Sequence, residues 1–161
     1  MMPTRQRLDP ACVLLTGATG FVGKVVLHRL LRQTPAVRRI YVVIRSKSGK
    51  SVEARWQQVL ASPCFAGMQQ ALERVAVPIE ANLSARRCDL GDAVLERLRQ
   101  EVTQVIHCAA SVDFDLALPL ACESNITASL EVLGLARSLP RLRRMVSVST
   151  AYVTPHRRGS L

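Results

Sequence analysis

A glycine-rich turn between an apolar run and an amphipathic segment is the feature that most constrains this chain. Residues 11–15 read as a buried strand, and the turn at residues 16–23, Thr-Gly-Ala-Thr-Gly-Phe-Val-Gly, leads into a segment of helical periodicity. Gly17 permits a tight turn, Gly20 lets the backbone approach a pyrophosphate, and Gly23 allows close packing of helix on strand. The helix would direct its unpaired N–H groups and positive dipole end at the phosphates. This strand–turn–helix context predicts a dinucleotide site; without it, the glycines would suggest only a structural turn.

The residue after the second predicted strand indicates which dinucleotide is bound. Residues 39–44 form an apolar run that ends at Arg45, where an NAD-binding protein usually has an acidic residue for the ribose hydroxyls. An arginine suits a 2′-phosphate instead, so the expected cofactor is NADPH, with weaker support from Lys47 and Lys50. The alternative reading is a solvated basic loop.

Strands and helices alternate along the whole chain, which predicts an α/β fold with a Rossmann-type, doubly wound parallel sheet of about five strands. Residues 1–10 are expected to be an N-terminal tail and residues 11–161 an NAD(P)-binding domain. The predicted strands cover residues 11–15, 39–44, 75–80, 104–108 and 144–148, and the predicted helices cover residues 21–33, 52–61, 68–73, 92–101 and 119–138.

The charge of the chain indicates an anionic partner. With 22 Lys+Arg and 12 Asp+Glu the net charge is +10, and residues 1–50 hold ten of the basic residues and one acid. This concentration around the glycine turn and Arg45 favours a phosphate-rich cofactor. Nucleic-acid binding is not expected, because the chain has only 3 Phe, 2 Tyr and 1 Trp and no recognised DNA-binding motif.

The cysteines and the apolar runs bear on the cellular compartment. The five cysteines, an odd number without a C-x-x-C pair, are expected to be reduced core thiols and to form neither a disulfide framework nor a zinc site. No uncharged apolar stretch approaches the ~18 residues that span a bilayer. These features predict a cytoplasmic protein.

Several segments together resemble the N-terminal part of the fatty acyl-CoA reductases, the male-sterility type of the extended short-chain dehydrogenase/reductase superfamily. The resemblance covers residues 11–154. The segments that carry it, beside the glycine turn, are Ile-Tyr-Val-Val-Ile-Arg at 40–45, Ser-Val-Glu-Ala-Arg at 51–55, Ser-Pro-Cys-Phe at 62–65, Val-Pro-Ile-Glu at 77–80, Ile-His-Cys-Ala-Ala-Ser-Val-Asp-Phe-Asp at 106–115 and Val-Ser-Thr-Ala-Tyr-Val at 148–153. Thioester reductase domains of carboxylic acid reductases share the turn but are less similar after the second strand.

The resemblance implies roles for individual residues. Asn125 matches an asparagine near the active site, and Thr150 matches the hydroxyl residue that polarises the substrate carbonyl. Ser149 is a neighbouring hydroxyl and a weaker candidate, placed with the cofactor-binding residues. His107 is expected to be a satisfied strand-end histidine and not a general base. The full set of expected cofactor-binding residues is Thr16, Gly17, Thr19, Gly20, Phe21, Val22, Gly23, Arg45, Asn82, Leu83, Ala109, Ala110 and Ser149.

One segment departs from the family pattern. The family has Gly-Asp-Leu-Ser after the third strand, with the aspartate on the adenine amino group, whereas residues 81–84 here are Ala-Asn-Leu-Ser. Asn82 can still accept a hydrogen bond, though without charge. A rival register uses Asp89, which precedes His107 by a spacing found elsewhere in the superfamily. We prefer Asn82, since the predicted strand leads directly into it, and Asp89 stays open.

The Tyr-x-x-x-Lys pair that these enzymes use for protonation and ribose binding does not occur in the sequence. Tyr152 is followed by His156, and the last lysine is Lys50. In the family the pair lies beyond this point, so the chain is expected to be an N-terminal fragment, incomplete at its C-terminus and inactive alone.

The resemblance implies that the intact protein reduces a long-chain fatty acyl-CoA to aldehyde or alcohol with NADPH. It also allows peripheral membrane association of the full-length protein, and it leaves the oligomeric state open. The alternatives are another extended short-chain reductase or epimerase, acting on a carrier-bound thioester or a nucleotide sugar, and a non-catalytic dinucleotide-binding module.

Overall fold

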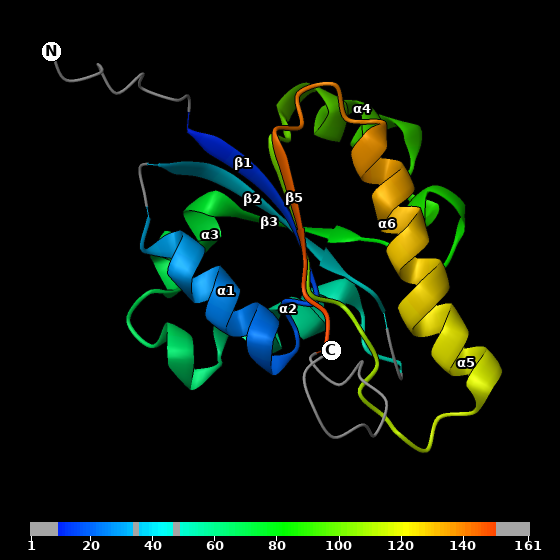
Figure 1. The fold of residues 1–161 in the computed structure, drawn as a ribbon. Helices are drawn as coiled ribbons and strands as arrows, with labels where there is room; N and C mark the ends of the chain where they lie inside the picture. Colours follow the sequence, from blue (N-terminus) through cyan, green and yellow to red (C-terminus); the bar gives the residue numbers. More distant parts are fainter. Residues whose placement is uncertain (1–9, 34–35, 47–48, 151–161) are drawn as a thin grey trace, which may run out of the picture.

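A five-stranded parallel sheet with strand order β3-β2-β1-β4-β5 runs through the middle of the molecule (Figure 1). The computed structural model describes residues 10–33, 36–46 and 49–150. The strands are β1 (Ala11–Thr16), β2 (Val37–Ile44), β3 (Ala76–Glu80), β4 (Gln104–His107) and β5 (Arg144–Ser147). The order, with β1 in the centre and chain reversal between β1 and β4, confirms the predicted Rossmann-type α/β class.

Helices lie between successive strands in the chain, as the crossover connections of a parallel sheet require. The α-helices are α1 (Phe21–Leu31), α2 (Val52–Leu60), α3 (Gln69–Val75), α4 (Asp92–Glu101), α5 (Leu118–Cys122) and α6 (Ala128–Arg137), with short 3₁₀ turns at Pro63–Phe65 and Arg86–Asp89. The helix predicted as continuous over residues 119–138 is interrupted. A π-helical turn, Glu123–Thr127, separates α5 from α6.

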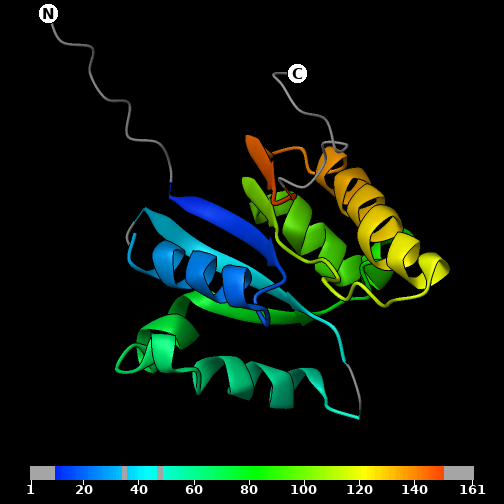
Figure 2. The ribbon, with the colours of Figure 1, turned by 60° about the horizontal axis from the view of Figure 1, so that its bottom comes forward.

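Two hydrophobic layers enclose the sheet because its strands bury alternate side chains on opposite faces. On one face, α1, α2 and α3 cover Val13, Leu15 and Val42, with Trp56 and Phe65 in the same cluster. On the other face, α4 and α6 cover the side chains that alternate with these (Figure 2). The residues of this second cluster include Cys12, Leu14, Tyr41, Val43, Leu98, Val105, Val132 and Leu135.

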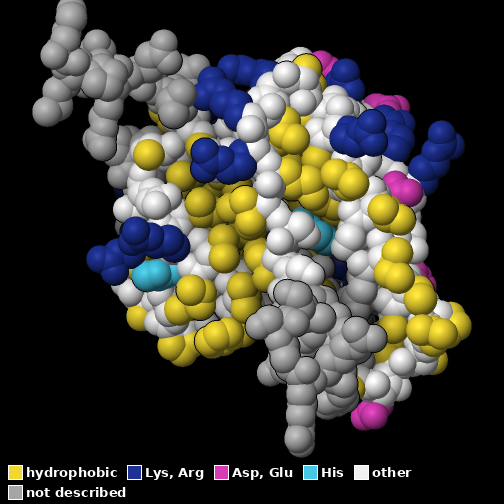
Figure 3. Space-filling model, in the orientation of Figure 1, with side chains coloured by type: hydrophobic (Ala, Val, Ile, Leu, Met, Phe, Trp, Pro, Cys, Tyr) yellow, Lys and Arg dark blue, Asp and Glu magenta, His cyan; other side chains and the backbone are white. Residues whose placement is uncertain are grey.

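Some apolar side chains of α1 and of the edge strand β5 are not covered by other elements. Of the apolar residues that gave α1 its helical periodicity, Leu30 and Leu31 are buried, whereas Phe21 and Val25 are exposed. The space-filling view shows the resulting apolar surface around α1 and the neighbouring edge of the sheet (Figure 3). In β5, the edge strand, Val146 is 45% exposed. The sheet is therefore better covered over β1–β3 than over β5.

The amino ends of the strands form one edge of the sheet, and charged residues pair with one another there. Arg38 and Arg39, in the first residues of β2, lie 3.6 and 3.2 Å from the carboxylate of Glu101 at the end of α4. Cys12 donates its N–H to Thr103 Oγ1 over 3.1 Å. The prediction that the basic residues of the first third gather around the glycine turn is thus wrong for these two arginines, which lie at the opposite edge.

All five cysteines fall within the described ranges and are free thiols. Cys12 and Cys88 are buried, and burial raises the pKa of each thiol to about 11. Cys64 is exposed, so the expectation of core thiols is wrong for this residue, which follows Pro63 in a 3₁₀ turn on the surface. In the described part of the chain, no helix is long and apolar enough to cross a bilayer.

Candidate cofactor site

The glycine turn lies at the carboxyl edge of the sheet, between β1 and α1. Gly17 has a φ of +78°, and a Cβ there would lie 2.6 Å from the backbone nitrogen of Ala109, which follows β4. A Cβ on Gly23 would lie 2.1 Å from the carbonyl oxygen of Gly17. Both positions therefore exclude any side chain, because the turn folds directly against β4 and against the first turn of α1. Gly17 and Gly23 fix the shape of the turn.

Gly20 differs from the other two glycines. A Cβ there would meet only the carbonyl oxygen of Gly17, at 3.3 Å, and the residue is exposed as the N-cap of α1. The first turn of α1 contains no acidic side chain, and Phe21 is 82% exposed. An open backbone surface at the N-terminus of an eleven-residue helix is the arrangement that admits a pyrophosphate. The residues present thus fit a dinucleotide.

Thr16, the last residue of β1, binds the end of β4. Its hydroxyl oxygen accepts the backbone N–H groups of Cys108 and Ala109, each over 3.2 Å, and lies 2.7 Å from His107 Nδ1. His107 is buried, and its Nε2 lies 3.2 Å from Ser129 Oγ. Both ring nitrogens are therefore hydrogen-bonded, which confirms the prediction of a satisfied strand-end histidine.

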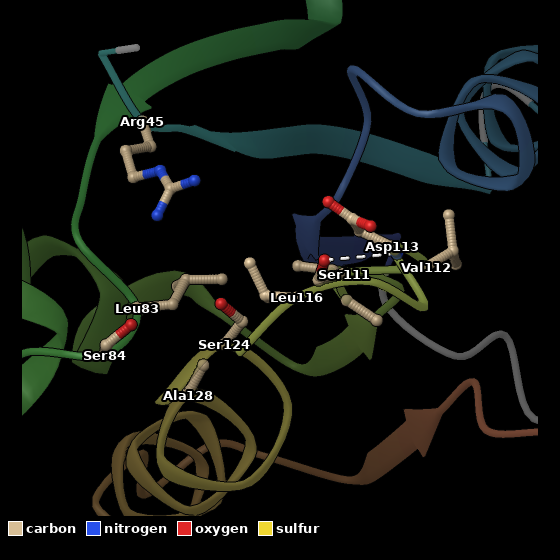
Figure 4. A pocket seen from close by; sticks show the side chains of 11 residues that line it. Arg45, Leu83, Ser84, Ser111, Val112, Asp113, Leu116, Ser124 and Ala128 are labelled. Carbon is tan, nitrogen blue, oxygen red and sulfur yellow. Dashed lines mark hydrogen bonds between the residues drawn. The ribbon is translucent and has the colours of Figure 1, made fainter. Parts of the chain in front are cut away.

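A cavity of about 470 Å³ opens beside the turn, at the carboxyl ends of β2, β3 and β4 (Figure 4). Arg45 extends into it from the end of β2, while Leu83 faces it from the segment after β3. Ala109 and Ala110 form its wall after β4. Ligands of doubly wound sheets bind at this position, outside the strand ends next to the reversal of strand order. Four of the predicted cofactor residues thus line one cavity.

Arg55, in the second turn of α2, connects two parts of the site that are far apart in sequence. One guanidinium nitrogen donates to Thr19 Oγ1 in the glycine turn over 3.2 Å, and another donates to the carbonyl oxygen of Arg45. A smaller pocket of about 200 Å³ beside these contacts includes Thr19, Lys24 and Arg55. Two cations therefore lie next to the turn, in addition to Arg45 above the main cavity.

The segment after β3 distinguishes the two candidate registers by position. β3 ends at Glu80, and Asn82 follows it directly, with its Oδ1 accepting the N–H of Ser84 over 3.3 Å. Leu83 and Ser84 line the cavity. Asp89 lies seven residues further on, in a turn where Arg87, Cys88 and Asp89 all have positive φ, and it lines a separate pocket with Arg86. Asn82 is not among the lining residues, but it directly precedes Leu83 and Ser84, which are.

Asn125 holds the segment that follows β4. Its Oδ1 accepts the N–H of Ser111 over 2.7 Å, and its Nδ2 donates to the carbonyl oxygen of Ser111 over 3.1 Å. Ser111 lines the cavity, as does Ser124, the neighbour of Asn125 in the π-helical turn. π-Helical turns occur frequently at functional sites.

Ser149 and Thr150 follow β5 and are exposed at the same edge of the sheet. The backbone N–H of Val148 donates to the carbonyl oxygen of His107 over 2.8 Å, which keeps this segment beside β4. Tyr152 lies outside the described residues. Val22, also predicted for the cofactor site, is 48% exposed in the first turn of α1, next to Phe21.

Several lining residues were not predicted from the sequence, namely Ser84, Ser111, Val112, Asp113, Leu116, Ser124 and Ala128. Most belong to the loop after β4 and the helical turn that returns to it, where no periodic pattern marks orientation. Arg55 was also missed as a site residue. Arg55 belongs to the segment at 51–55 that carries the family resemblance, but no pattern in the sequence indicates its contact with Thr19.

Comparison with known families and proteins gives consistent similarities. A family model described as "Male sterility protein", of the NAD-binding class, matches residues 15–161. Fatty acyl-CoA reductase 1 of Gallus gallus is 36% identical over 149 residues, which are 91% of this chain and 29% of the relative. Fatty acyl-CoA reductase 2 of Mus musculus is 35% identical over 143 residues, 87% of this chain and 28% of the relative.

A solved structure shares the fold. The terminal R domain of the myxalamid PKS–NRPS biosynthetic pathway superposes with a TM-score of 0.78 and 31% identity, covering 93% of this chain and 37% of that domain. The chain therefore spans less than a third of the length of the curated relatives, and little more than a third of the R domain.

Proposed function

Because the chain belongs to the male sterility protein family, an NAD-binding family, we propose that it is the cofactor-binding part of an NADPH-dependent reductase of long-chain fatty acyl-CoA. The observation that carries this proposal is the cavity at the strand ends, which Arg45, Leu83 and Ala109 line beside an open glycine turn. Residues 11–161 make up this part of the proposed enzyme. A cytoplasmic location, with the whole protein docking on a membrane surface, belongs to the same proposal.

The proposal assigns binding roles to groups of the chain. The N–H groups at the start of α1 and the uncovered backbone at Gly20 bind the pyrophosphate. The guanidinium of Arg45 pairs with the 2′-phosphate in a bidentate manner, which a ribose hydroxyl could not offer. Asn82 accepts a hydrogen bond from the adenine amino group, and Leu83 packs against the ring. Ala109 and Ala110 are small enough for the cofactor to lie along the end of β4.

Bound NADPH supplies the hydride that converts the thioester to an aldehyde with release of the coenzyme A thiol, and a second hydride gives the alcohol. The Thr150 hydroxyl would donate a hydrogen bond to the carbonyl oxygen as its negative charge develops. Ser149 is a second hydroxyl next to it. Asn125 would fix the loop at Ser111 that closes the cavity on the substrate side.

Cofactor preference tests the binding half of the proposal. Arg45→Ala should weaken NADPH binding by about tenfold to a hundredfold, because it removes a charge-assisted hydrogen bond of about 1.5–3 kcal/mol. NADH binding should stay unchanged, as measured by titration calorimetry. Arg97→Ala, an exposed arginine on α4, is the matched control. Equal losses for NADPH and NADH would contradict the assignment of Arg45 to the 2′-phosphate.

The reaction itself is tested with the gene's complete reading frame. NADPH oxidation should require palmitoyl-CoA or a similar long-chain thioester and should release one free thiol for each aldehyde formed. The 161-residue chain alone should bind NADPH without turning over. Turnover by the short chain would refute its incompleteness, and activity with carrier-bound but not CoA-bound acyl groups would refute the substrate class.

A further inference from the structure

Three polar side chains form a hydrogen-bonded row across the carboxyl edge of the sheet. Thr16 ends β1, His107 ends β4, and Ser129 lies in the first turn of α6. The row runs from Thr16 Oγ1 to His107 Nδ1 (2.7 Å), and from His107 Nε2 to Ser129 Oγ (3.2 Å). Ser129 Oγ then donates to the backbone carbonyl oxygen of Asn125 over 2.6 Å. The row thus begins at Thr16, the first residue of the glycine turn, and ends at the π-helical turn.

The neighbours of Thr16 determine the direction of every hydrogen bond in the row. Its hydroxyl oxygen already accepts the N–H group of Ala109 and that of Cys108, which it shares with the backbone carbonyl oxygen of Thr16 at 3.3 Å, and a hydroxyl oxygen has two lone pairs. The Thr16 proton is therefore donated to Nδ1 of His107, which must carry no proton. A neutral imidazole with a bare Nδ1 is protonated on Nε2, so it donates to Ser129 Oγ. The Ser129 proton is left for Asn125.

The surroundings of the ring favour its neutral form. His107 is 2% exposed, and burial lowers the pKa of its imidazole below the ordinary value. A charged ring would also carry a proton on Nδ1, and this proton would meet a hydroxyl oxygen whose lone pairs are both in use. Protonation would break the bond to Thr16 or displace one of the two backbone N–H groups.

We propose that His107, as the neutral Nε2–H tautomer, is a positioning residue that couples the backbone after β4 to the helical turn carrying Asn125. Through Thr16 it holds the N–H groups of Cys108 and Ala109. Through Ser129 it holds the carbonyl oxygen of Asn125, whose side chain is hydrogen-bonded to the backbone of Ser111 at the cavity. The proposed function enters only where the wall at Ala109 is taken to contact NADPH; the tautomer and the coupling do not depend on it.

Nuclear magnetic resonance on the 161-residue chain, labelled with ¹⁵N-histidine, reads the tautomer directly. Two-bond ¹H–¹⁵N correlations of the ring should show a protonated Nε2 and a bare Nδ1 at neutral pH, with the signals assigned by their loss in His107→Asn. A ring protonated on Nδ1, or on both nitrogens, at neutral pH would overturn the proposal.

Variants on either side of the ring test the coupling. Thr16→Val keeps the shape but removes the hydroxyl, so the ring should lose its single-tautomer pattern, and Thr16→Ser should retain it. Ser129→Ala should shift the side-chain amide signals of Asn125, which donates to Ser111. Ser138→Ala is the matched control, because Ser138 in the same helical segment also donates to a backbone carbonyl, that of Leu135, but lies outside the row.

An affinity measurement separates this inference from the proposed function. Thr16→Val should weaken NADPH binding by about threefold to tenfold, the value of a lost hydrogen bond, and Ser138→Ala should leave it unchanged. Unchanged ring signals in Thr16→Val, or unchanged Asn125 signals in Ser129→Ala, would refute the coupling. If the wild-type chain failed to bind NADPH, the proposed function would fall while the ring signals would still decide the tautomer.

Discussion

The two edges of the same sheet use polar residues in different ways. At the amino edge, Arg38 and Arg39 pair with Glu101, and Thr103 bonds the backbone of Cys12, so the charged side chains of this edge neutralise one another. At the carboxyl edge, polar side chains bind one another and the backbone of neighbouring loops, and they border a cavity. Arg45 extends into that cavity, where no acidic partner is shown for it in the described part of the chain.

This difference confines ligand binding to one edge of the sheet, whereas both edges contribute to stability. Parallel strands place all their carboxyl ends at one edge, where each connection to a helix is a loop that can be shaped for a ligand. At the amino edge the chain passes from each helix into the next strand, and ion pairs between charged side chains can stabilise this edge. Substitutions at the amino edge should therefore change stability without changing NADPH affinity, and those in the closely packed turn at the carboxyl edge should change stability most.

The largest effect is expected where the carboxyl edge is packed most closely. Gly23→Ala places a methyl group against the backbone of Gly17 and should lower the free energy of unfolding by at least about 3 kcal/mol, because backbone must move. Urea unfolding followed by circular dichroism measures this. Gly134→Ala in α6, where a Cβ meets no atom within 4 Å, should instead stabilise the chain by about 0.5–1 kcal/mol. Similar stabilities for the two variants would contradict this account of the turn.

An intermediate loss of stability is expected on acidification, and it should arise at the carboxyl edge, from His107. Burial lowers the pKa of His107 in the folded chain below the value of 6.5 that applies when the chain is unfolded. The unfolded form therefore takes up a proton first as the pH falls, and stability declines below about pH 7 until the folded ring also protonates. The slope due to this residue cannot exceed about 1.4 kcal/mol per pH unit.

Unfolding curves between about pH 7.5 and pH 5.5 measure this slope above the range where most carboxylates titrate. His107→Asn keeps an acceptor near the position of Nδ1 and cannot titrate, so its stability should vary less over the same interval. A variant with the same pH dependence as the original chain would assign the slope to other groups.

The smallest effect is expected at the amino edge. Glu101→Gln removes the partner of Arg38 and Arg39, whose side chains are partly exposed, and should cost about 1 kcal/mol of stability. The loss should shrink in high salt, and NADPH affinity should not change. Glu96→Gln in the same helix removes an equal charge from a residue hydrogen-bonded to Gln100, and should cost less. A loss of NADPH affinity in Glu101→Gln would show that the two edges are coupled.

The sequence predicted the strands and most helices to within one or two residues. Buried parallel strands are continuous apolar runs, so residues such as Leu14 and Val42 stand out. The glycine turn could be predicted because Gly17 and Gly23 are required by the backbone itself. Ala109 was predicted to line the cofactor site from the resemblance to a family and from its position after β4.

Other features could not be read from the pattern. A π-helical turn shifts the hydrogen bonds by one residue without changing composition, so the interruption at Glu123–Thr127 left no signal. The helical periodicity of Phe21 and Val25 predicted an apolar helix face, but it could not predict whether another element covers that face; both residues are exposed. The ion pairs of Arg38 and Arg39 depend on Glu101, which is more than sixty residues away in sequence.

The central position of β1 has a consequence for the order of folding. β1 and β2 are separated by one helix, whereas Thr16 and His107 are 91 residues apart in the chain. Closing the longer loop costs more chain entropy, so we expect β1, β2 and β3 to associate before β4 joins them. Pulse-labelled hydrogen exchange should then protect the amide of Val42 before that of Ile106. The cavity, which needs the ends of both halves, would be the last part of the molecule to form.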